Sequence, residues 1–295
     1  MNEPRAAEKT GTIDVEGGRV RYRENGSQHD GAVPVLCIHG GPGMSHEYML
    51  PLVDLADQRR MVFYDQLDAG ESDRPGDSAN WRVERFVAEV DAVRHALGLD
   101  RVVIIGNSWG GTIAAEYAIG CPEGLAGLVL SSPLINTHRW IADNTAYRNQ
   151  LPVEVRAALD HHEAAGTTDD PAYQEAVDVF SGRHGCRMDP LPDYVLRAFD
   201  ALNLECYSTM WGPSEFTANG TLTDYDCGER LHNIEAPTLF TCGEFDEATP
   251  HSCREYAALV PGAEVAVIED ASHMAFAEKR DEYVALMRDF IARIE

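Results

Sequence analysis

The run DRVVIIGNSWGGTIAAEYA, residues 100–118, limits the possible fold most strongly, because an apolar segment passes into a helix-like one through a glycine-rich turn. VVII is typical of a strand that is buried on both faces of a sheet. Similar apolar runs occur in VPVLCIHG, RRMVFYDQ, LAGLVLSSP and APTLFTCG. Because helical patterns separate several of them, the sequence predicts an α/β fold with a mostly parallel sheet flanked by helices.

A helical insertion is predicted between residues 134 and 230. The segments HRWIADNTAYRNQL, VEVRAALDHHEAAG and PDYVLRAFDALNLE have helical patterns, and no convincing strand interrupts them. Strand and helix alternate again after this stretch. We therefore expect one α/β core from residues 1–133 and 231–295, with residues 134–230 inserted as a helical cap.

Composition excludes several classes of partner. The formal net charge of −25 makes nucleic acid and anionic membranes improbable partners. This negative charge would either attract a cationic substrate or simply keep the protein in solution. The polar start MNEPRAAEKT is not a signal peptide, and no apolar run is long enough to span a membrane. The 7 cysteines are scattered and lack CxxC spacing, so reduced thiols and a cytoplasmic location are expected.

Ser108 is the candidate nucleophile. It is the serine of a G-x-S-x-G pattern between a predicted strand and a predicted helix, as in the nucleophile elbow of α/β-hydrolases. Gly106 and Gly110 have no Cβ, so the strand and the helix can approach closely around the strained serine. The alternative is an ordinary glycine-rich turn without chemistry.

A nucleophilic serine needs a base, and the base needs an acid that orients it. His273 follows the run AEVAVIEDAS near the C-terminus, where this fold places the base, and Asp246 follows the run TLFTCGEF. Some hydrolases carry the acid one strand earlier, but that position reads SSPL and has no carboxylate. Most other histidines, including His29, His46 and His184, are interpreted as ordinary core or surface residues.

Two backbone N–H groups are needed to stabilise the oxyanion. One is assigned to Trp109, the residue after the nucleophile, and the other to Gly41 in the glycine-rich loop HGGPG. No paired metal ligands are present in the sequence, and this chemistry requires neither a metal nor a cofactor.

Several motifs together resemble the proline iminopeptidase and L-amino-acid amidase family of α/β-hydrolases. They are HGGPGMSHEY, DQLDAGESDRP, GNSWGGTIAAEYA, GPSEFTANGTLTDYD, GEFDEATP and SHMAF. The matches extend from residue 36 to about residue 276. A closer resemblance is to the actinobacterial aminoacyl amide hydrolases of macrolactam biosynthesis, which remove an aminoacyl protecting group from a polyketide intermediate.

The resemblance implies a serine hydrolase that cleaves the amide bond after an unblocked N-terminal L-amino acid. Its substrate would be an aminoacyl amide or a short peptide, and its family match assigns recognition of the free ammonium group to Glu215 and Glu247. The family usually has glycine at the position of Asp68, so this carboxylate either changes the rim of the cleft or points to solvent. Two alternatives remain: an esterase that does not recognise an amine, and a receptor or inactive scaffold with the same fold.

Overall fold

The computed structural model describes residues 3–27 and 31–295, so His29 lies outside the described residues. Within these ranges an eight-stranded sheet has the order β1-β2-β4-β3-β5-β6-β7-β8. Strands β3 to β8 are joined by parallel pairings, whereas β1 pairs antiparallel with β2, and β2 with β4. The predicted α/β class with a mostly parallel sheet is therefore confirmed.

The strands are β1 (Lys9–Val15), β2 (Gly18–Asn25), β3 (Val35–Ile38), β4 (Met61–Tyr64), β5 (Val102–Asn107), β6 (Leu125–Ser131), β7 (Thr238–Gly243) and β8 (Glu264–Ile268). Strands β3 to β7 coincide with the apolar runs of the sequence, whereas β1 and β2 mix polar and apolar residues. Every residue of β3, β4, β5 and β7 is buried. Such burial explains why these strands read as continuous apolar runs rather than alternating ones.

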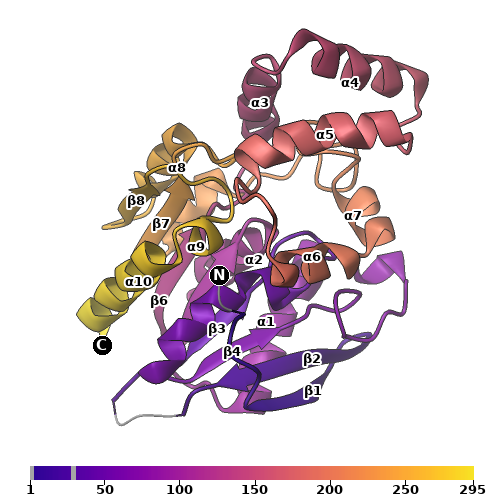
Figure 1. Cartoon of the computed structure of the whole chain (residues 1–295). Helices are drawn as coiled ribbons and strands as arrows, with labels where there is room; N and C mark the ends of the chain where they lie inside the picture. Colours follow the sequence, from indigo (N-terminus) through magenta and orange to yellow (C-terminus); the bar gives the residue numbers. More distant parts are fainter. Residues whose placement is uncertain (1–2, 28–30) are drawn as a thin grey trace.

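Helices cover both faces of the sheet (Figure 1). Those of the α/β core are α1 (Val83–Leu97), α2 (Trp109–Ile119), α8 (Pro250–Ala257), α9 (Ala275–Glu278) and α10 (Arg280–Ile294), and a 3₁₀ segment, η1 (His46–Asp57), follows β3. Ile104 belongs to the core cluster beneath α1 and α2, and Val103 and Ile105 to the cluster beneath η1 and α10. Successive side chains of a strand point to opposite faces, so β5 contributes to both clusters.

Five further helices lie between β6 and β7. They are α3 (Thr137–Arg148), α4 (Val153–Ala165), α5 (Pro171–His184), α6 (Asp193–Asp200) and α7 (Leu204–Met210), and the 3₁₀ segment η3 (Gly228–Asn233) follows them. Asn136, Asp170 and Asn203 cap α3, α5 and α7 with their side-chain oxygens. In Figure 1, α3, α4, α5 and α7 stand above the sheet. The division of the chain at residues 134 and 230 stays a prediction.

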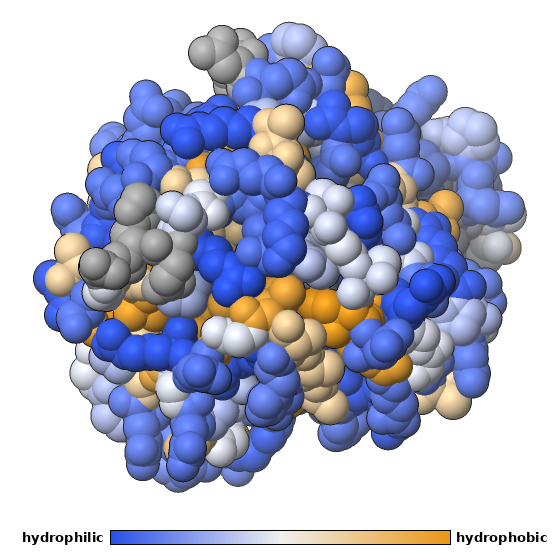
Figure 2. Space-filling model, turned by 90° about the horizontal axis from the view of Figure 1, so that it is seen from below, coloured by the Kyte–Doolittle hydropathy of each residue, from blue (hydrophilic) through white to orange (hydrophobic). Residues whose placement is uncertain are grey.

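The face of the molecule seen in Figure 2 is mostly hydrophilic. Figure 2 shows the side opposite to α4 and α5, where hydrophilic residues surround a narrow band of apolar ones. Among the described residues, no helix has both the length and the apolar character needed to cross a membrane. All cysteine side chains except that of Cys121 are buried.

The glycines around Ser108 provide a test of the packing between β5, α2 and β3. A Cβ on Gly110 would lie 2.1 Å from the carbonyl oxygen of Ile38, and one on Gly106 would lie 2.2 Å from that of Gly110. Neither backbone can move freely, so Gly110→Ala should lower the free energy of unfolding by more than about 3 kcal/mol. Urea denaturation followed by tryptophan fluorescence measures this change.

Gly182→Ala is the matched control, because Gly182 lies within α5 and a Cβ there would meet nothing within 4 Å. This variant should be more stable than the parent by roughly 0.5–1 kcal/mol, the usual difference between alanine and glycine in a helix. A Gly110→Ala protein as stable as the parent would show that the helix does not contact the strand so closely.

Candidate active site

Ser108 occupies a strained turn between β5 and α2. Its backbone angles are φ 56° and ψ −121°, a region that non-glycine residues adopt only at a cost of about 1–3 kcal/mol. The Ser108 N–H donates to the carbonyl oxygen of Ser131 at 3.0 Å, and the Ser108 carbonyl accepts from Gly111 N at 2.8 Å. These bonds hold the turn, and the half-buried serine stands at the end of the strand.

The glycine-rich loop after β3 lies beside Ser108. A Cβ on Gly40 would lie 2.9 Å from the Cβ of Ser108. The Gly40 N–H already donates to the Tyr48 hydroxyl at 2.7 Å, and that hydroxyl donates to Asn107 Oδ1 at 2.7 Å. In the part of the chain that the structure describes, the N–H groups of Gly41 and Trp109 donate no hydrogen bond. Both are therefore free to bind an oxyanion.

The side chain of Trp109 is fixed separately from its backbone N–H. Its indole Nε1 donates to Gln66 Oε1 at 2.9 Å, and Gln66 Nε2 donates to the His39 carbonyl at 2.7 Å. The loop after β4 thus joins the start of α2 to the glycine-rich loop. A change at Gln66 would remove a hydrogen bond from each of these two segments.

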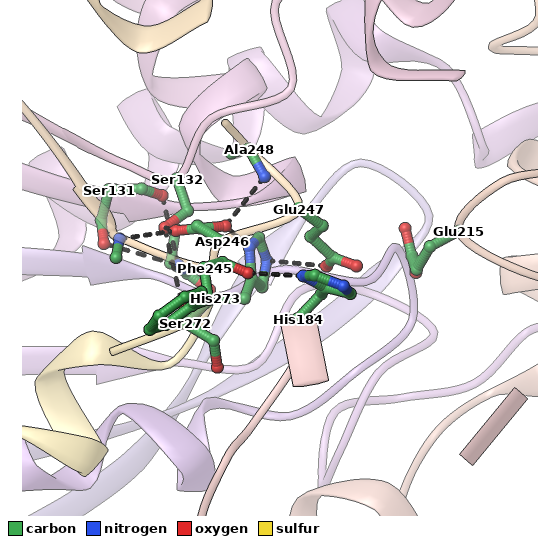
Figure 3. A network of polar contacts seen from close by, with 12 residues as sticks. Ser131, Ser132, His184, Glu215, Phe245, Asp246, Glu247, Ala248, Ser272 and His273 are labelled. Atoms are coloured by element: carbon green, nitrogen blue, oxygen red, sulfur yellow. Dashed lines mark hydrogen bonds and ion pairs between the residues drawn. The ribbon is translucent and has the colours of Figure 1, made fainter. Parts of the chain in front are cut away.

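Asp246 and His273 form a buried pair across two loops (Figure 3). The imidazole Nδ1 lies 2.9 Å from Asp246 Oδ1, and it must carry the proton because the carboxylate is the acceptor. Asp246 also accepts from Ala248 N at 2.8 Å, Gly243 N at 3.0 Å and the Ser132 hydroxyl at 2.5 Å. These four donors hold the carboxylate in one orientation.

Ser132 is a residue that the sequence did not single out. It follows β6, in the SSPL segment where the sequence offers no alternative acid, and it has a positive φ of 50°. Its hydroxyl donates to Asp246 and also lies 3.4 Å from the His273 carbonyl. A hydroxyl therefore supports the acid from the neighbouring strand. The position of SSPL at the end of β6 was the one available signal.

Glu247 and Glu215 gather beside the other nitrogen of the imidazole. Glu247 Oε1 lies 3.5 Å from His273 Nε2, and both side chains are buried. Glu215 comes from the segment after α7, where it accepts from the Tyr207 hydroxyl at 2.5 Å, and its carbonyl accepts from Trp140 Nε1 at 3.1 Å. In Figure 3, Glu247 lies between His273 and Glu215. The structure thus brings both predicted glutamates to His273.

The ionisable side chains of His273, Glu247 and Glu215 strongly affect one another's pKa values. Burial disfavours the positive charge of His273, but Glu247 and Asp246 outweigh it and raise the pKa of His273 to about 9. Burial, followed by the charge of Glu215, raises the pKa of the Glu247 carboxyl well above its usual value. Burial also raises the pKa of Glu215, although the Tyr207 hydroxyl opposes this shift. Among the described residues, His273 is the one positive group that acts on both glutamates, so the site is strongly acidic.

His184, interpreted from the sequence as an ordinary histidine, connects the inserted helices to both catalytic loops. At the end of α5, its Nδ1 donates to the Phe245 carbonyl at 2.7 Å, and its own carbonyl accepts from His273 N at 3.1 Å. The ring stacks on Tyr147 with centroids 4.0 Å apart, and burial lowers the pKa of His184. No local sequence pattern marks this role, because every partner is distant in the chain.

Metal ligation has no structural basis among the described residues, where no group of three His, Cys, Asp or Glu side chains could hold an ion.

Comparisons with known proteins show the family to which this fold belongs. The α/β hydrolase fold family matches residues 33–280. A proline iminopeptidase of Heyndrickxia coagulans is 41% identical over 96% of this chain and 99% of that protein. Among solved structures, VinJ has a TM-score of 0.95 at 34% identity and covers 98% of this chain and 100% of its own. The proline iminopeptidase of Mycobacterium smegmatis has a TM-score of 0.90 at 34% identity, with 97% and 98% covered.

The chain belongs to the proline iminopeptidase family of α/β-hydrolases.

Asp68 is where this member of the proline iminopeptidase family departs from the expected glycine. The residue has a positive φ of 66° and is completely buried, so the alternative in which its carboxylate points to solvent is wrong. Its carboxylate accepts from Trp81 Nε1 and from Gly76 N, both at 2.9 Å. Aspartate tolerates the left-handed conformation better than most residues, and here it supports a surface loop.

Replacing Asp68 separates the contribution of its carboxylate to stability from that of its strained backbone. Asp68→Gly removes the acceptor of two donors but relieves the backbone, and should lower the free energy of unfolding by about 1–3 kcal/mol. Asp68→Ala removes the same acceptor and keeps the strained φ, so it should be less stable than Asp68→Gly by a further ~1 kcal/mol. Urea denaturation of both variants measures the difference. Equal midpoints for the parent and both variants would contradict a structural role for this carboxylate.

Proposed function

We propose that this protein is a serine aminopeptidase that removes an unblocked N-terminal L-amino acid from an amide. The observation that carries the proposal is the position of Glu247, a buried carboxylate 3.5 Å from the base nitrogen of His273, with Glu215 beyond it. Two neighbouring carboxyl groups with raised pKa values form a site that a cation would stabilise. A free α-ammonium group is the cation that lies next to a scissile aminoacyl carbonyl.

The remaining residues supply the chemistry of acyl transfer. Ser108 Oγ attacks the carbonyl carbon, and His273 Nε2 accepts its proton, while Asp246 keeps the imidazole in the Nδ1–H tautomer. The N–H groups of Gly41 and Trp109 stabilise the oxyanion. His273 then donates the proton to the leaving amine, which gives an aminoacyl-enzyme and a free amine. Water, activated by the same histidine, releases the amino acid.

The substrates are aminoacyl amides or short peptides. The names of the relatives make N-terminal proline the first residue to test. The motif resemblance to the hydrolases of macrolactam biosynthesis adds amide-protected natural-product amines as leaving groups. The net charge of −25 disfavours nucleic acid as a partner. We place the protein in the cytoplasm, in keeping with its unpaired cysteines.

Ser108→Ala tests the nucleophile. The variant should fold as the parent does, because it loses only the hydroxyl, but kcat on an aminoacyl p-nitroanilide should fall by roughly 10⁴-fold or more. A fluorophosphonate probe should label the parent at Ser108 alone, as mass spectrometry of the digested protein would show. Labelling elsewhere, or full activity without labelling, would support the receptor or scaffold alternative.

Glu215→Gln and Glu247→Gln test recognition of the amine. Either change leaves a buried ammonium without one partner, at a cost of about 2–5 kcal/mol. This corresponds to a loss of roughly 30- to 4,000-fold in kcat/KM on a free aminoacyl p-nitroanilide. Neither variant should lose hydrolysis of p-nitrophenyl acetate, because that ester has no amine. The two substrates assayed side by side separate recognition from chemistry.

N-acetylated substrates are the control on the substrate side. Acetylation removes the positive charge and adds bulk in the same place, so the parent enzyme should not turn over an N-acetyl-aminoacyl p-nitroanilide. If the parent cleaves the free and N-acetylated forms equally well, the protein is an esterase or general amidase that does not recognise an amine.

A further inference from the structure

The imidazole of His273 is held between two carboxylates. Asp246 Oδ1 lies 2.9 Å from Nδ1, and Glu247 Oε1 lies 3.5 Å from Nε2. The exposed fractions of the His273 and Glu247 residues are 6% and 5%, and that of Asp246 is 0%. Water can therefore do little to screen either contact. Because the pKa values of both His273 and Glu247 are raised, this pair retains one proton between Nε2 and the carboxylate, and Nε2 is not available as a free base.

This arrangement conflicts with the first step of catalysis. A general base must present an unprotonated Nε2 to the serine hydroxyl. Within the described residues, the Ser108 hydroxyl makes no hydrogen bond to His273, and the nitrogen that should receive its proton faces Glu247. Glu247 thus competes with Ser108 for the working nitrogen of the base.

Other groups around His273 do not remove this conflict. Glu215, after α7, adds a third negative charge near the imidazole. The carbonyl of His184, at the end of α5, accepts from the His273 backbone, and Trp140 of α3 presents its ring edge-on at 5.8 Å. Glu278 of α9 is engaged by Ser272, and Tyr207 of α7 by Glu215. None of these neighbours brings a positive charge.

We propose that Glu247 holds His273 out of catalysis until the substrate ammonium pairs with Glu247, so that the ammonium group activates the base as well as binding the substrate. The inference rests on the proposed function and extends it. Glu247 then determines specificity in the chemical step: a substrate without an amine occupies the site but leaves the base paired with the carboxylate.

The charges balance in this step. Before binding, the proton on His273 Nε2 is directed at Glu247. When the ammonium takes its place beside Glu247, the imidazolium loses its stabilising partner and releases that proton to solvent. One cation enters and one proton leaves, so the net charge of the pocket is unchanged. The neutral Nε2 can then accept a hydrogen bond from Ser108.

The wild-type protein provides the first test, with an ester as substrate. At pH 7 a histidine with a pKa of about 9 is neutral in about 1% of molecules, whereas one with the ordinary pKa of about 6.5 is neutral in about three quarters. Ammonium chloride should therefore increase kcat/KM for p-nitrophenyl acetate at pH 7, by at most roughly 70-fold. The same salt should inhibit hydrolysis of an aminoacyl p-nitroanilide competitively.

Potassium chloride is the control, since K⁺ is close to NH₄⁺ in size but has no N–H donors. It should activate the ester reaction much less at the same ionic strength, which must be held constant because salt screens charges. The acidic limb of the ester kcat/KM profile should lie near pH 9 without ammonium and move to lower pH with it, because the neutral imidazole is the active form.

Variants give the second test. Glu247→Gln should hydrolyse p-nitrophenyl acetate at pH 7 faster than the parent, by a factor of about 10 or more, and ammonium should no longer activate it. Glu215→Gln should shift the ester profile less, because Glu215 acts on the imidazole from farther away. Glu269→Gln, which removes an exposed carboxylate on the loop before His273, should leave both activities unchanged.

Two results would overturn the inference. One is ester hydrolysis by the wild type that ammonium inhibits or does not change; the other is a folded Glu247→Gln protein with no gain on the ester. If the enzyme still does not cleave N-acetylated amides, the proposed function stands, and Glu247 binds the substrate ammonium without controlling the base. If N-acetylated and free amides are cleaved equally, the proposed function itself fails.

Discussion

The close approach of β5, α2 and β3 around Ser108 is the constraint on which the site depends. Gly110 lies against the Ile38 carbonyl, and the backbone of Ser108 is strained as a result of the sharp turn. The strain is stabilised by burial of every residue of β5 between two core clusters. A rigid sheet therefore holds the nucleophile, while the loops around it supply the other groups.

Those loops place an unusual amount of negative charge in a buried volume. Asp246 is satisfied by four donors, whereas the Glu247 carboxylate lies between His273 and Glu215, and its pKa is raised by burial and by Glu215. A site of this kind is unfavourable when empty and becomes favourable when a cation enters. Selection among substrates then follows from electrostatics: a neutral ligand of the same shape leaves the repulsion in place.

The sequence predicted the features that depend on local pattern or on chain order. Buried parallel strands read as apolar runs, and the elbow around Ser108 combines glycines with a strand and a helix, so the fold class followed directly. Asp246 and His273, which the structure pairs, were proposed as acid and base because each follows a recognisable strand. Ser132, His184 and Tyr207 were not located, because their roles come from contacts 8 to 141 residues away in the chain. The direction of the Asp68 carboxylate stayed open because its donors, Gly76 N and Trp81 Nε1, lie 8 and 13 residues away in the chain.

The contacts of His184 and Gly185 have a consequence for protein engineering. Besides the His184 contacts, the Gly185 carbonyl accepts from Met274 N at 3.2 Å. The middle of the insertion is therefore anchored to the catalytic loops, and it is more than a lid attached at two ends. Exchanging these helices for those of a relative, with joints only at the ends of β6 and β7, would replace one side of that contact. A chimera intended to change substrate preference must carry the loops after β7 and β8 together with the helices.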